Sequence, residues 1–479
     1  MRILLLNPPA RNYYGKLGIQ LMPLGIAYLA GTLLESGHQV HVIDLMVEPE
    51  RETKIRFSDY DLVGISSDTP RYPKSLQLAK KAKKTGAVVV MGGYHATFLD
   101  REAIDSGVVD FVVRGEGEYI LLELANALEH TGDVSPIKGI SYRADGTFVR
   151  NPSAPYIHNL DKIPFPRRDL FPREKYLSLY QDRPMTTMVT SRGCPFDCAF
   201  CSASRFGGLK WRTRSLDSIL DEMEFLLNQQ YTSFLFVDDN FTLNPKRVID
   251  FSEEVLRRKW DIRWWCFSRA DTVVHNPEMV RKMAGAGNRT VFLGLESASQ
   301  STLDEWGKKI TLKQQQQAVR ILKENGIRVY GSFIIGDLHE DQKMVRQTIR
   351  YARQLNPHTC QFSVLTPYPG TRLFHELREK NLLRTFDWRE YDGIHTVIKL
   401  EHLNPDELNK LVRRAYRKFY LRLSNLPGLL KSILKKPGEL KLVIGEFISG
   451  VKIFRELKKK RFHSGKKSME SEKEILKRA

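Results

Sequence analysis

The amino-acid sequence is poor in cysteine, with five among 479 residues and none before position 194. So few thiols cannot form a disulfide scaffold, and we expect a protein of the reducing cytoplasm. Cys266 and Cys360 stand singly inside apolar stretches, which is typical of buried packing residues. The apolar run at the start of the sequence is too short for a secretory signal peptide, and no small-residue cleavage pattern follows it.

A long uninterrupted apolar segment is also missing. Residues 17–34 carry no charge and approach the length of a membrane span, but Gln20, Pro23, Gly25 and Gly31 interrupt them. Apolar strand patterns flank this stretch on both sides. We therefore interpret it as a buried crossover helix that begins at Pro23, and not as a transmembrane segment.

Three of the five cysteines form a cluster. Cys194, Cys198 and Cys201 have the spacing C-x3-C-x2-C. Three thiolates on so short a loop can hold a cuboidal iron-sulfur cluster and leave one iron without a protein ligand, which marks a reactive site and not a closed structural one. A zinc loop is the alternative, but it needs a fourth Cys or His close by, and the nearest histidines are His158 and His275.

The triplet, with Phe200 just before its last cysteine, resembles the radical S-adenosylmethionine (SAM) superfamily. The resemblance implies a 4Fe-4S cluster whose fourth iron is chelated by the amino and carboxylate groups of SAM. It also implies an enzyme that cleaves SAM reductively, with an electron donor such as flavodoxin or ferredoxin. Such chemistry needs a dry pocket that keeps the resulting radical from water.

Residues 1 to about 130 alternate short apolar strands with helical stretches, which predicts βαβ units and a parallel sheet. Ligands of such sheets bind beyond the carboxyl ends of the strands. No G-x-G-x-x-G follows the first strand, which argues against a dinucleotide site. Polar residues and glycines do follow the expected strands, namely Asn7, Ser66, Ser67, Asp68, Gly92, Gly93, His95, Gly115 and Glu116.

An open α/β domain directly before a radical SAM barrel resembles the cobalamin-binding radical SAM enzymes, and the resemblance spans residues 1 to about 385. The phrases around Asn7, Gly92 and Gly115 are similar to the strand-end loops of that group, and the residues named above are implied to bind cobalamin. The D-x-H-x-x-G signature of other cobalamin proteins is absent. We therefore expect no histidine on cobalt, the loop 68–72 at its lower face, and His95 either beside the nucleotide tail or in a structural role.

From residue 185 a second series of six strand and helix units predicts a partial (β/α)6 barrel, with the cysteine loop after its first strand. Chemistry in such barrels gathers at the carboxyl ends of the strands. Asp238 and Asp239 are expected to accept the SAM amino group, unless they cap a helix or turn. Glu296 is expected to bind SAM or to form a buried ion pair. Further SAM candidates are Phe200, Ser268, Arg269, Ser297, Ile335 and Gly336, the last two on a stretch that resembles the superfamily's adenine-contacting fifth strand.

The fold class is therefore α/β, with four regions: a Rossmann-like (flavodoxin-like) cobalamin-binding domain at 1–135, a hairpin and proline-rich linker at 136–184, the radical SAM partial barrel at 185–385, and a basic helical region at 386–479. Of the net charge of +19, residues 431–479 contribute 15 Lys/Arg against 6 Asp/Glu. Apolar residues at helical spacing in 440–457 predict a peripheral membrane contact or a partner helix, with an ordinary helix covering the barrel as the alternative.

These observations predict a cobalamin-dependent radical SAM enzyme that methylates or cyclises an unactivated carbon. Named relatives suggested by the resemblance are anaerobic magnesium-protoporphyrin monomethyl ester cyclases and enzymes that modify hopanoids and archaeal lipids, which implies a hydrophobic substrate. One alternative is a radical SAM enzyme without cobalamin, whose first domain is a docking module. Another is an RNA-modifying factor that uses the basic tail, although no nucleic-acid module is recognisable and we expect no nucleic-acid partner.

Overall fold

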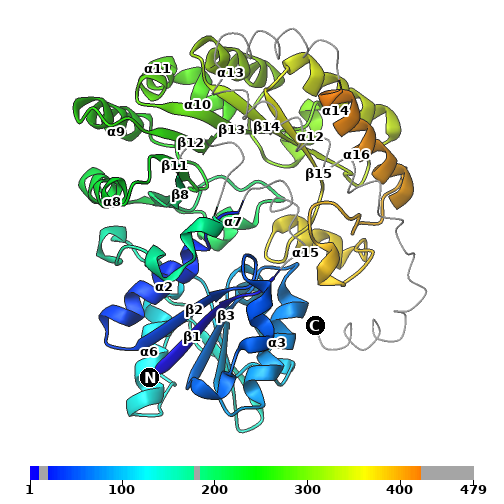
Figure 1. The fold of residues 1–479 in the computed structure, drawn as a ribbon. Coiled ribbons are helices and arrows are strands. Elements are labelled where there is room, and N and C mark those ends of the chain that lie inside the picture. The colour runs from blue at the N-terminus through cyan, green and yellow to red at the C-terminus, as the bar shows by residue number, and fades with distance from the viewer. Residues whose placement is uncertain (10–19, 177–183, 422–479) are drawn as a thin grey trace.

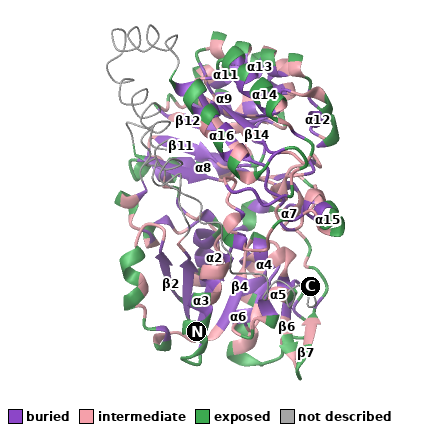
Figure 2. Ribbon diagram, turned by 90° about the vertical axis from the view of Figure 1, so that its right-hand side faces the viewer, coloured by how far each residue is buried: buried purple, intermediate pink, exposed green. Residues whose placement is uncertain are grey.

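The computed structural model describes residues 1–9, 20–176 and 184–421. These residues form a pair of β-sheets that lie one above the other, with helices around them (Figure 1). Most strands are buried, the hairpin strand at residues 147–150 is half-buried to exposed, and the outward faces of the helices are exposed (Figure 2). Within the described residues, no helix has the length and apolar character needed to cross a membrane. The predicted amphipathic segment 440–457 lies outside the described residues.

The N-terminal sheet has seven strands in the order β2-β1-β3-β4-β5-β6-β7, of which the first five are parallel and the last two form the predicted hairpin. In β1, Ile3 and Leu5 face the helices α2 and α6, while Leu4 and Leu6 face α3. Both faces of the sheet are therefore covered, as the apolar strand patterns predict. The elements are β1 (Arg2–Asn7), α2 (Leu24–Glu35), β2 (Gln39–Asp44), β3 (Leu62–Ser66), α3 (Tyr72–Lys83), β4 (Val88–Gly92), α4 (Tyr94–Phe98), α5 (Asp100–Asp105), β5 (Phe111–Val113), α6 (Gly117–His130), β6 (Ile140–Ala144) and β7 (Thr147–Arg150).

The second sheet has six parallel strands in the order β15-β14-β13-β12-β11-β8. Its two edge strands do not pair with each other, so the barrel is partial, which confirms the predicted fold. The connecting helices cover its outer side. The elements are β8 (Met185–Met188), α8 (Leu216–Asn228), β11 (Ser233–Phe236), α9 (Pro245–Arg257), β12 (Arg263–Ser268), α10 (Ala270–His275), α11 (Pro277–Gly285), β13 (Asn288–Glu296), α12 (Gln300–Glu305), α13 (Leu312–Glu324), β14 (Arg328–Ile335), α14 (Gln342–Leu355) and β15 (Thr359–Val364).

The segments that follow the barrel strands pack on both sheets. Helix α15 (Arg372–Glu379) and the turn η6 (Trp388–Glu390) pack with the α3 side of the N-terminal sheet in one hydrophobic cluster. Helix α16 (Pro405–Tyr420) packs on β15, where the hydroxyl of Tyr420 binds the backbone of Cys360. The apolar side of α16 thus covers the barrel, as expected for an ordinary helix of the fold.

Candidate active site between the two sheets

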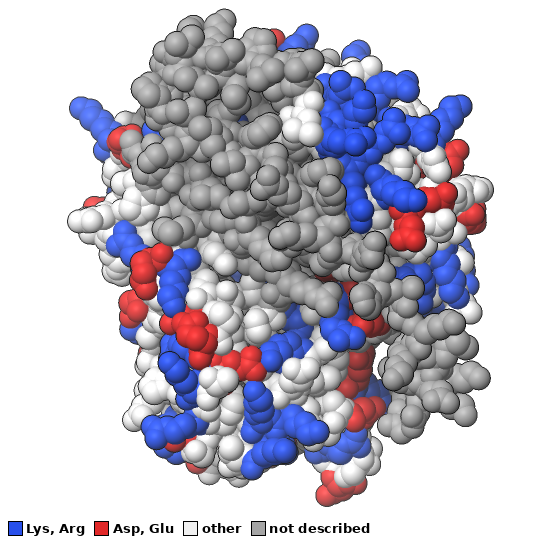
Figure 3. Space-filling model, turned by 45° about the vertical axis from the view of Figure 1, so that its right-hand side comes forward, with Lys and Arg blue, Asp and Glu red and all other residues white. Residues whose placement is uncertain are grey.

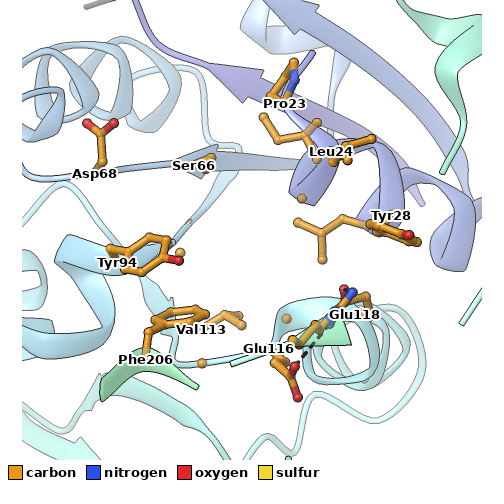
Figure 4. Close-up of a pocket in the computed structure, with 18 of the residues that line it drawn as sticks. Pro23, Leu24, Tyr28, Ser66, Asp68, Tyr94, Val113, Glu116, Glu118 and Phe206 are labelled. Carbon is orange, nitrogen blue, oxygen red and sulfur yellow. Dashed lines mark hydrogen bonds and ion pairs between the residues drawn. The ribbon is translucent and has the colours of Figure 1, made fainter. Parts of the chain in front are cut away.

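A cavity of about 460 Å³ lies between the carboxyl ends of the N-terminal strands and the beginning of the barrel (Figure 4). The barrel contributes Arg192 and Gly193, which directly precede the first clustered cysteine, and Asp239. The cavity therefore joins the two predicted cofactor sites. Eight of the nine residues predicted to bind cobalamin line it: Asn7, Ser66, Ser67, Asp68, Gly92, Gly93, Gly115 and Glu116.

The loops after β3 and β4 approach each other closely at this edge. Gly93 has a positive φ of 98°, and a Cβ atom there would stand 2.7 Å from the carbonyl oxygen of Ser67. The same oxygen accepts a hydrogen bond from the backbone N–H of His95 at 3.2 Å. A side chain at position 93 would separate the loops, so the sheet edge requires glycine here.

The ninth predicted residue, His95, does not line the cavity. Its imidazole is fully buried between the rings of Tyr72 and Trp388, with centroids 4.0 and 5.0 Å away. Within the described residues neither ring nitrogen has a hydrogen-bond partner, and burial lowers the pKa of His95 to about 3, so the ring is neutral. This packing is that of a structural core residue, and the predicted place of His95 beside the nucleotide tail stays a prediction.

The loop 68–72, predicted for the lower face of cobalt, does reach the cavity. Asp68 and Arg71 both line it and form an ion pair of 3.4 Å. The Arg71 guanidinium also donates to the side-chain oxygen of Asn7 at 3.2 Å. Its Nε is buried without a hydrogen-bond partner in the described structure.

Charged residues close the opposite side of the cavity, and sequence reasoning found Glu116 among them but missed Glu118, Arg192 and Arg212. Arg192 pairs with Glu118 at 2.6 Å and with Glu116 at 3.3 Å, and Arg212 pairs with Glu116 at 2.7 Å. Burial alone would raise the pKa of Glu116, but the two arginines outweigh burial and lower it. These pairs join the N-terminal domain to the strands β9 (Ser191–Arg192) and β10 (Arg212–Thr213), beside the cysteine loop.

Tyr94, also missed, lies between the cavity and the cysteines. Its ring stacks on Phe206 with centroids 4.3 Å apart, and Phe206 ends α7 (Ser202–Phe206), the helix that follows Cys201 (Figure 4). Burial raises the pKa of the Tyr94 hydroxyl, and the nearby Asp239 and Cys201 raise it further. The phenol therefore stays neutral beside both sites. The glycine-rich phrase Gly92-Gly93-Tyr94 was the signal that pointed to this loop.

The cysteine loop is held by backbone contacts to distant segments. The N–H of Ala199 donates to the carbonyl of Trp306 at 2.9 Å, and its carbonyl accepts from the N–H of Leu373 at 3.0 Å. The ring of Phe200 packs edge-on against Trp306 at 5.3 Å. The loop conformation thus depends on residues more than a hundred positions away. The predicted direct contact of Phe200 with SAM stays a prediction.

Burial controls the protonation of the cysteine thiols. Burial raises the pKa of Cys194 to about 11 and also raises that of Cys198, and the nearby Cys201 raises both further. Among the described residues, no three Cys, His, Asp or Glu side chains stand close enough to hold one metal ion. In a cubane each thiolate binds a different iron, so its ligands stand further apart. Cluster binding would expel the thiol protons that burial retains.

The two adjacent aspartates have different environments. Asp238 is buried and accepts hydrogen bonds from Thr190 N–H at 2.7 Å and from the hydroxyls of Thr190 and Ser191, each at 2.6 Å. Asp239 accepts one bond, from Gly193 N–H at 3.1 Å, and lines the cavity. Burial and the neighbouring Asp238 raise its pKa to about 6. Asp239 is therefore the aspartate available to a ligand, and Asp238 is a structural clamp.

The third and fourth barrel strands end in residues that support the cysteine loop. Arg269 binds Asp271 and the carbonyl of Lys308, and its guanidinium lies 3.7 Å from the ring centre of Phe196. Glu296 forms the buried ion pair given as an alternative, with the Lys308 ammonium at 2.7 Å. Burial alone would lower the pKa of Lys308, but Glu296 and Cys198 outweigh it. Ser268 and Ser297 are buried, with hydroxyl contacts to Thr242 and to the N–H of Ser299.

The fifth strand ends in a tight turn at Gly336. Its φ is positive, at 86°, and its N–H donates to the buried carboxylate of Glu340 at 2.6 Å. Burial raises the pKa of Glu340 to about 7. Ile335 is fully buried, and its carbonyl accepts from Leu365 N–H. The adenine contact of Ile335 and Gly336 stays a prediction, while Glu340 explains why the turn keeps its shape.

Comparison with known proteins decides between the alternatives. Residues 188–352 match the model of the radical SAM superfamily and residues 12–125 match that of the B12 binding domain. An uncharacterized methyltransferase of Pyrococcus horikoshii is 39% identical over 432 residues, which are 88% of this chain and 93% of the relative. The chain belongs to the cobalamin-binding radical SAM enzymes. The first domain is therefore a cobalamin-binding domain, and the docking-module alternative is wrong.

One further relative supports the assignment of this B12-binding radical SAM enzyme, and one solved structure shares its fold. The anaerobic magnesium-protoporphyrin IX monomethyl ester cyclase of Rubrivivax gelatinosus is 31% identical over 469 residues, covering 92% of this chain and 84% of the cyclase. The methyltransferase TsrM of Kitasatospora setae, solved with cobalamin and a [4Fe-4S] cluster, has the same fold, with a TM-score of 0.71, 18% identity and coverage of 94% and 99%.

The cofactors of this B12-binding radical SAM enzyme are a 4Fe-4S cluster, SAM and cobalamin, as predicted. When bound, the cluster supplies the electron for reductive cleavage of SAM, and cobalamin binds in the domain beside it. The chain's own residues place the two sites against one cavity wall. Asp239 lines the cavity, and its predicted contact with the SAM amino group stays a prediction. The ion pairs of Glu116 and Glu118 with Arg192 keep the domains in contact.

Proposed function

We propose that this enzyme modifies an unactivated carbon of a hydrophobic tetrapyrrole or lipid, by C-methylation or by oxidative cyclisation. The observation that carries the proposal is an aromatic row on the inner face of the barrel sheet. Side chains alternate along the strands, so Trp264 and Cys266 face the outer helices while Trp265 and Phe267 face inward. Phe267 continues into Phe292 at 4.9 Å between ring centres.

The row ends at Tyr330, whose ring lies 5.0 Å from that of Phe292. Half-buried aromatic rings in series offer a broad apolar surface, which suits a flat ring system or a polycyclic hydrocarbon. The Rubrivivax gelatinosus relative is named for a magnesium porphyrin substrate, which supports this class. A small polar substrate would leave these rings without partners and would gain little from them.

The test uses protein purified anaerobically and loaded with all three cofactors. It is incubated with dithionite, SAM carrying a deuterated methyl group, and total lipid or tetrapyrrole extracts. A labelled hydrophobic product means methylation, whereas a new unlabelled product means cyclisation. Turnover of polar metabolites alone would refute the proposal.

A pair of variants tests the aromatic row separately. Phe292→Ala should weaken substrate affinity about tenfold or more, because a buried aromatic side chain contributes roughly 2 kcal/mol or more to apolar contact. Formation of 5'-deoxyadenosine without substrate should not change. Phe225→Ala is the matched control, since Phe225 lies on the outer surface and is 50% exposed. Equal substrate affinity in the two variants would contradict the assignment.

We also propose that flavodoxin or ferredoxin reduces the cluster, and that the enzyme works at the inner face of the membrane, where a hydrophobic substrate would concentrate. Both are supported by the chemistry of the cluster and by the basic composition of the chain. Reduction by purified flavodoxin in place of dithionite tests the first. Work at the membrane requires that the enzyme has a surface that binds lipid.

A further inference from the structure

Two neighbouring helices of the barrel, α14 and α16, carry a continuous basic surface, here called the basic face. Lys and Arg side chains gather over these helices in Figure 3, with few acidic residues among them. Helix α14 contains no Asp or Glu, and the two acidic residues of α16, Asp406 and Glu407, lie in its first turn. The basic face consists of Lys343, Arg346, Arg350, Lys410, Arg413, Arg414, Arg417 and Lys418, of which Arg413 is half-buried and the others exposed.

The pairing of these cations differs from that of basic residues on other helices. On α9 and α11, Lys246 pairs with Asp250 at 2.8 Å and Lys282 with Glu253 at 2.7 Å. None of the eight cations of the basic face has an ion pair within residues 1–9, 20–176 and 184–421. Their charges therefore add to one another and produce a positive potential over the face, which favours an extended anionic partner.

The basic face is also rigid. The hydroxyl of Tyr416 binds the backbone of Phe362 at 3.2 Å, and that of Tyr420 binds the backbone of Cys360. These bonds fix the apolar side of α16 on β15, so the helix cannot turn that side toward a bilayer. Leu421, which is 55% exposed, follows directly at the end of the helix. A partner would thus meet fixed charges with one apolar side chain at their edge.

The position of the basic face argues against a redox protein as that partner. Helices α14 and α16 cover β14 and β15, at the opposite edge of the sheet from β8, after which the cysteine loop begins. A protein electron donor must approach the cluster, and here the barrel wall would stand between them. The chain that follows Leu421 combines leucines with further basic residues, the composition of a segment that binds membrane surfaces.

We propose that the basic face docks the enzyme on anionic lipid headgroups. Each Lys or Arg near such a surface adds to the binding free energy, and the attraction falls off within a Debye length. Eight fixed cations on two packed helices therefore suffice for reversible peripheral binding that salt weakens. The proposal does not depend on the identity of the substrate, because the binding site is on the outer surface of the barrel and the aromatic row on the inner face.

The experiment is co-sedimentation of the full-length, cofactor-loaded enzyme with vesicles of phosphatidylcholine alone or mixed with phosphatidylglycerol. The face variant carries Arg346→Glu, Arg350→Glu, Arg414→Glu and Lys418→Glu. The control carries four reversals in the N-terminal domain, with the same change in net charge. The control positions are Lys54, Lys80, Lys84 and Lys138, all exposed and without an ion pair in the described structure.

We expect the native enzyme to bind the mixed vesicles and not the neutral ones, with binding lost at high salt. The face variant should bind at least tenfold more weakly, while the control stays within about twofold of the native enzyme. Unchanged iron and cobalamin content would show that both variants are folded. Equal losses in the two variants would mean that net charge alone drives binding and would overturn the proposal. Native vesicle binding by the face variant with slower reduction by flavodoxin would overturn it in favour of an acidic protein.

Discussion

Replacing Gly193 by alanine should prevent assembly of the iron-sulfur cluster. Gly193 directly precedes the first cluster cysteine and has a φ of +82°. Alanine in that region costs about 1–2 kcal/mol. Its Cβ would also overlap the carbonyl oxygen of Lys210, which is backbone and cannot rotate away. The backbone that follows β9 would have to separate from the backbone that precedes β10, and Cys194 would move with it.

Gly132→Ala is the matched control for this variant. Gly132 has a similar φ of +71°, but a Cβ atom there has no neighbour within 4 Å. It therefore carries the same conformational cost of about 1–2 kcal/mol without the overlap. The difference between the two variants isolates the contact with Lys210.

The assay is iron and acid-labile sulfide per chain after anaerobic reconstitution, followed by 5'-deoxyadenosine formation with dithionite. We expect Gly132→Ala to match the native enzyme in both. Gly193→Ala should retain a small fraction of the iron and lose SAM cleavage. An iron content equal to that of Gly132→Ala would show that the loop tolerates the displacement, and the reasoning would be refuted.

Three further predictions concern titratable side chains. Asp239 becomes protonated below about pH 6, so the affinity for SAM, measured by equilibrium dialysis, should fall as the pH drops through that value. The Asp239→Asn variant should bind SAM weakly at every pH. The Asp238→Asn variant should lose solubility, because it alters a buried, hydrogen-bonded carboxylate. Because the pKa of His95 is lowered to about 3 in the folded chain, the unfolded chain binds a proton at a higher pH, and the free energy of unfolding should fall between about pH 6.5 and 3. The His95→Phe variant should flatten this loss in thermal unfolding and leave cobalamin uptake intact. The Lys308→Met variant leaves Glu296 buried without its partner, so the free energy of unfolding should fall by about 3–5 kcal/mol. Adding Glu296→Gln should restore most of the melting temperature. No recovery would contradict a paired role for the two residues.

Local sequence was sufficient for the chemistry of the cluster and for the order of the elements. The spacing of Cys194, Cys198 and Cys201 fixes three thiolates on one loop whatever surrounds them. Alternation of apolar strands and helices dictates parallel sheets, because such strands must be covered on both faces. For the same reason the loops at Asn7, Gly92 and Gly115 meet at one edge, as the prediction required.

Tertiary structure decided which side chains reach that edge and which support it. Asp238 and Asp239 are neighbours in sequence, but the hydroxyls that donate hydrogen bonds to Asp238 belong to Thr190 and Ser191, almost fifty residues earlier. His95 directly follows the predicted loop at Gly92 and Gly93, yet it is enclosed by Trp388, almost three hundred positions later in the chain. Local patterns describe the backbone path over a few residues, whereas burial and charge pairing depend on contacts between distant segments, and only the folded chain brings those together.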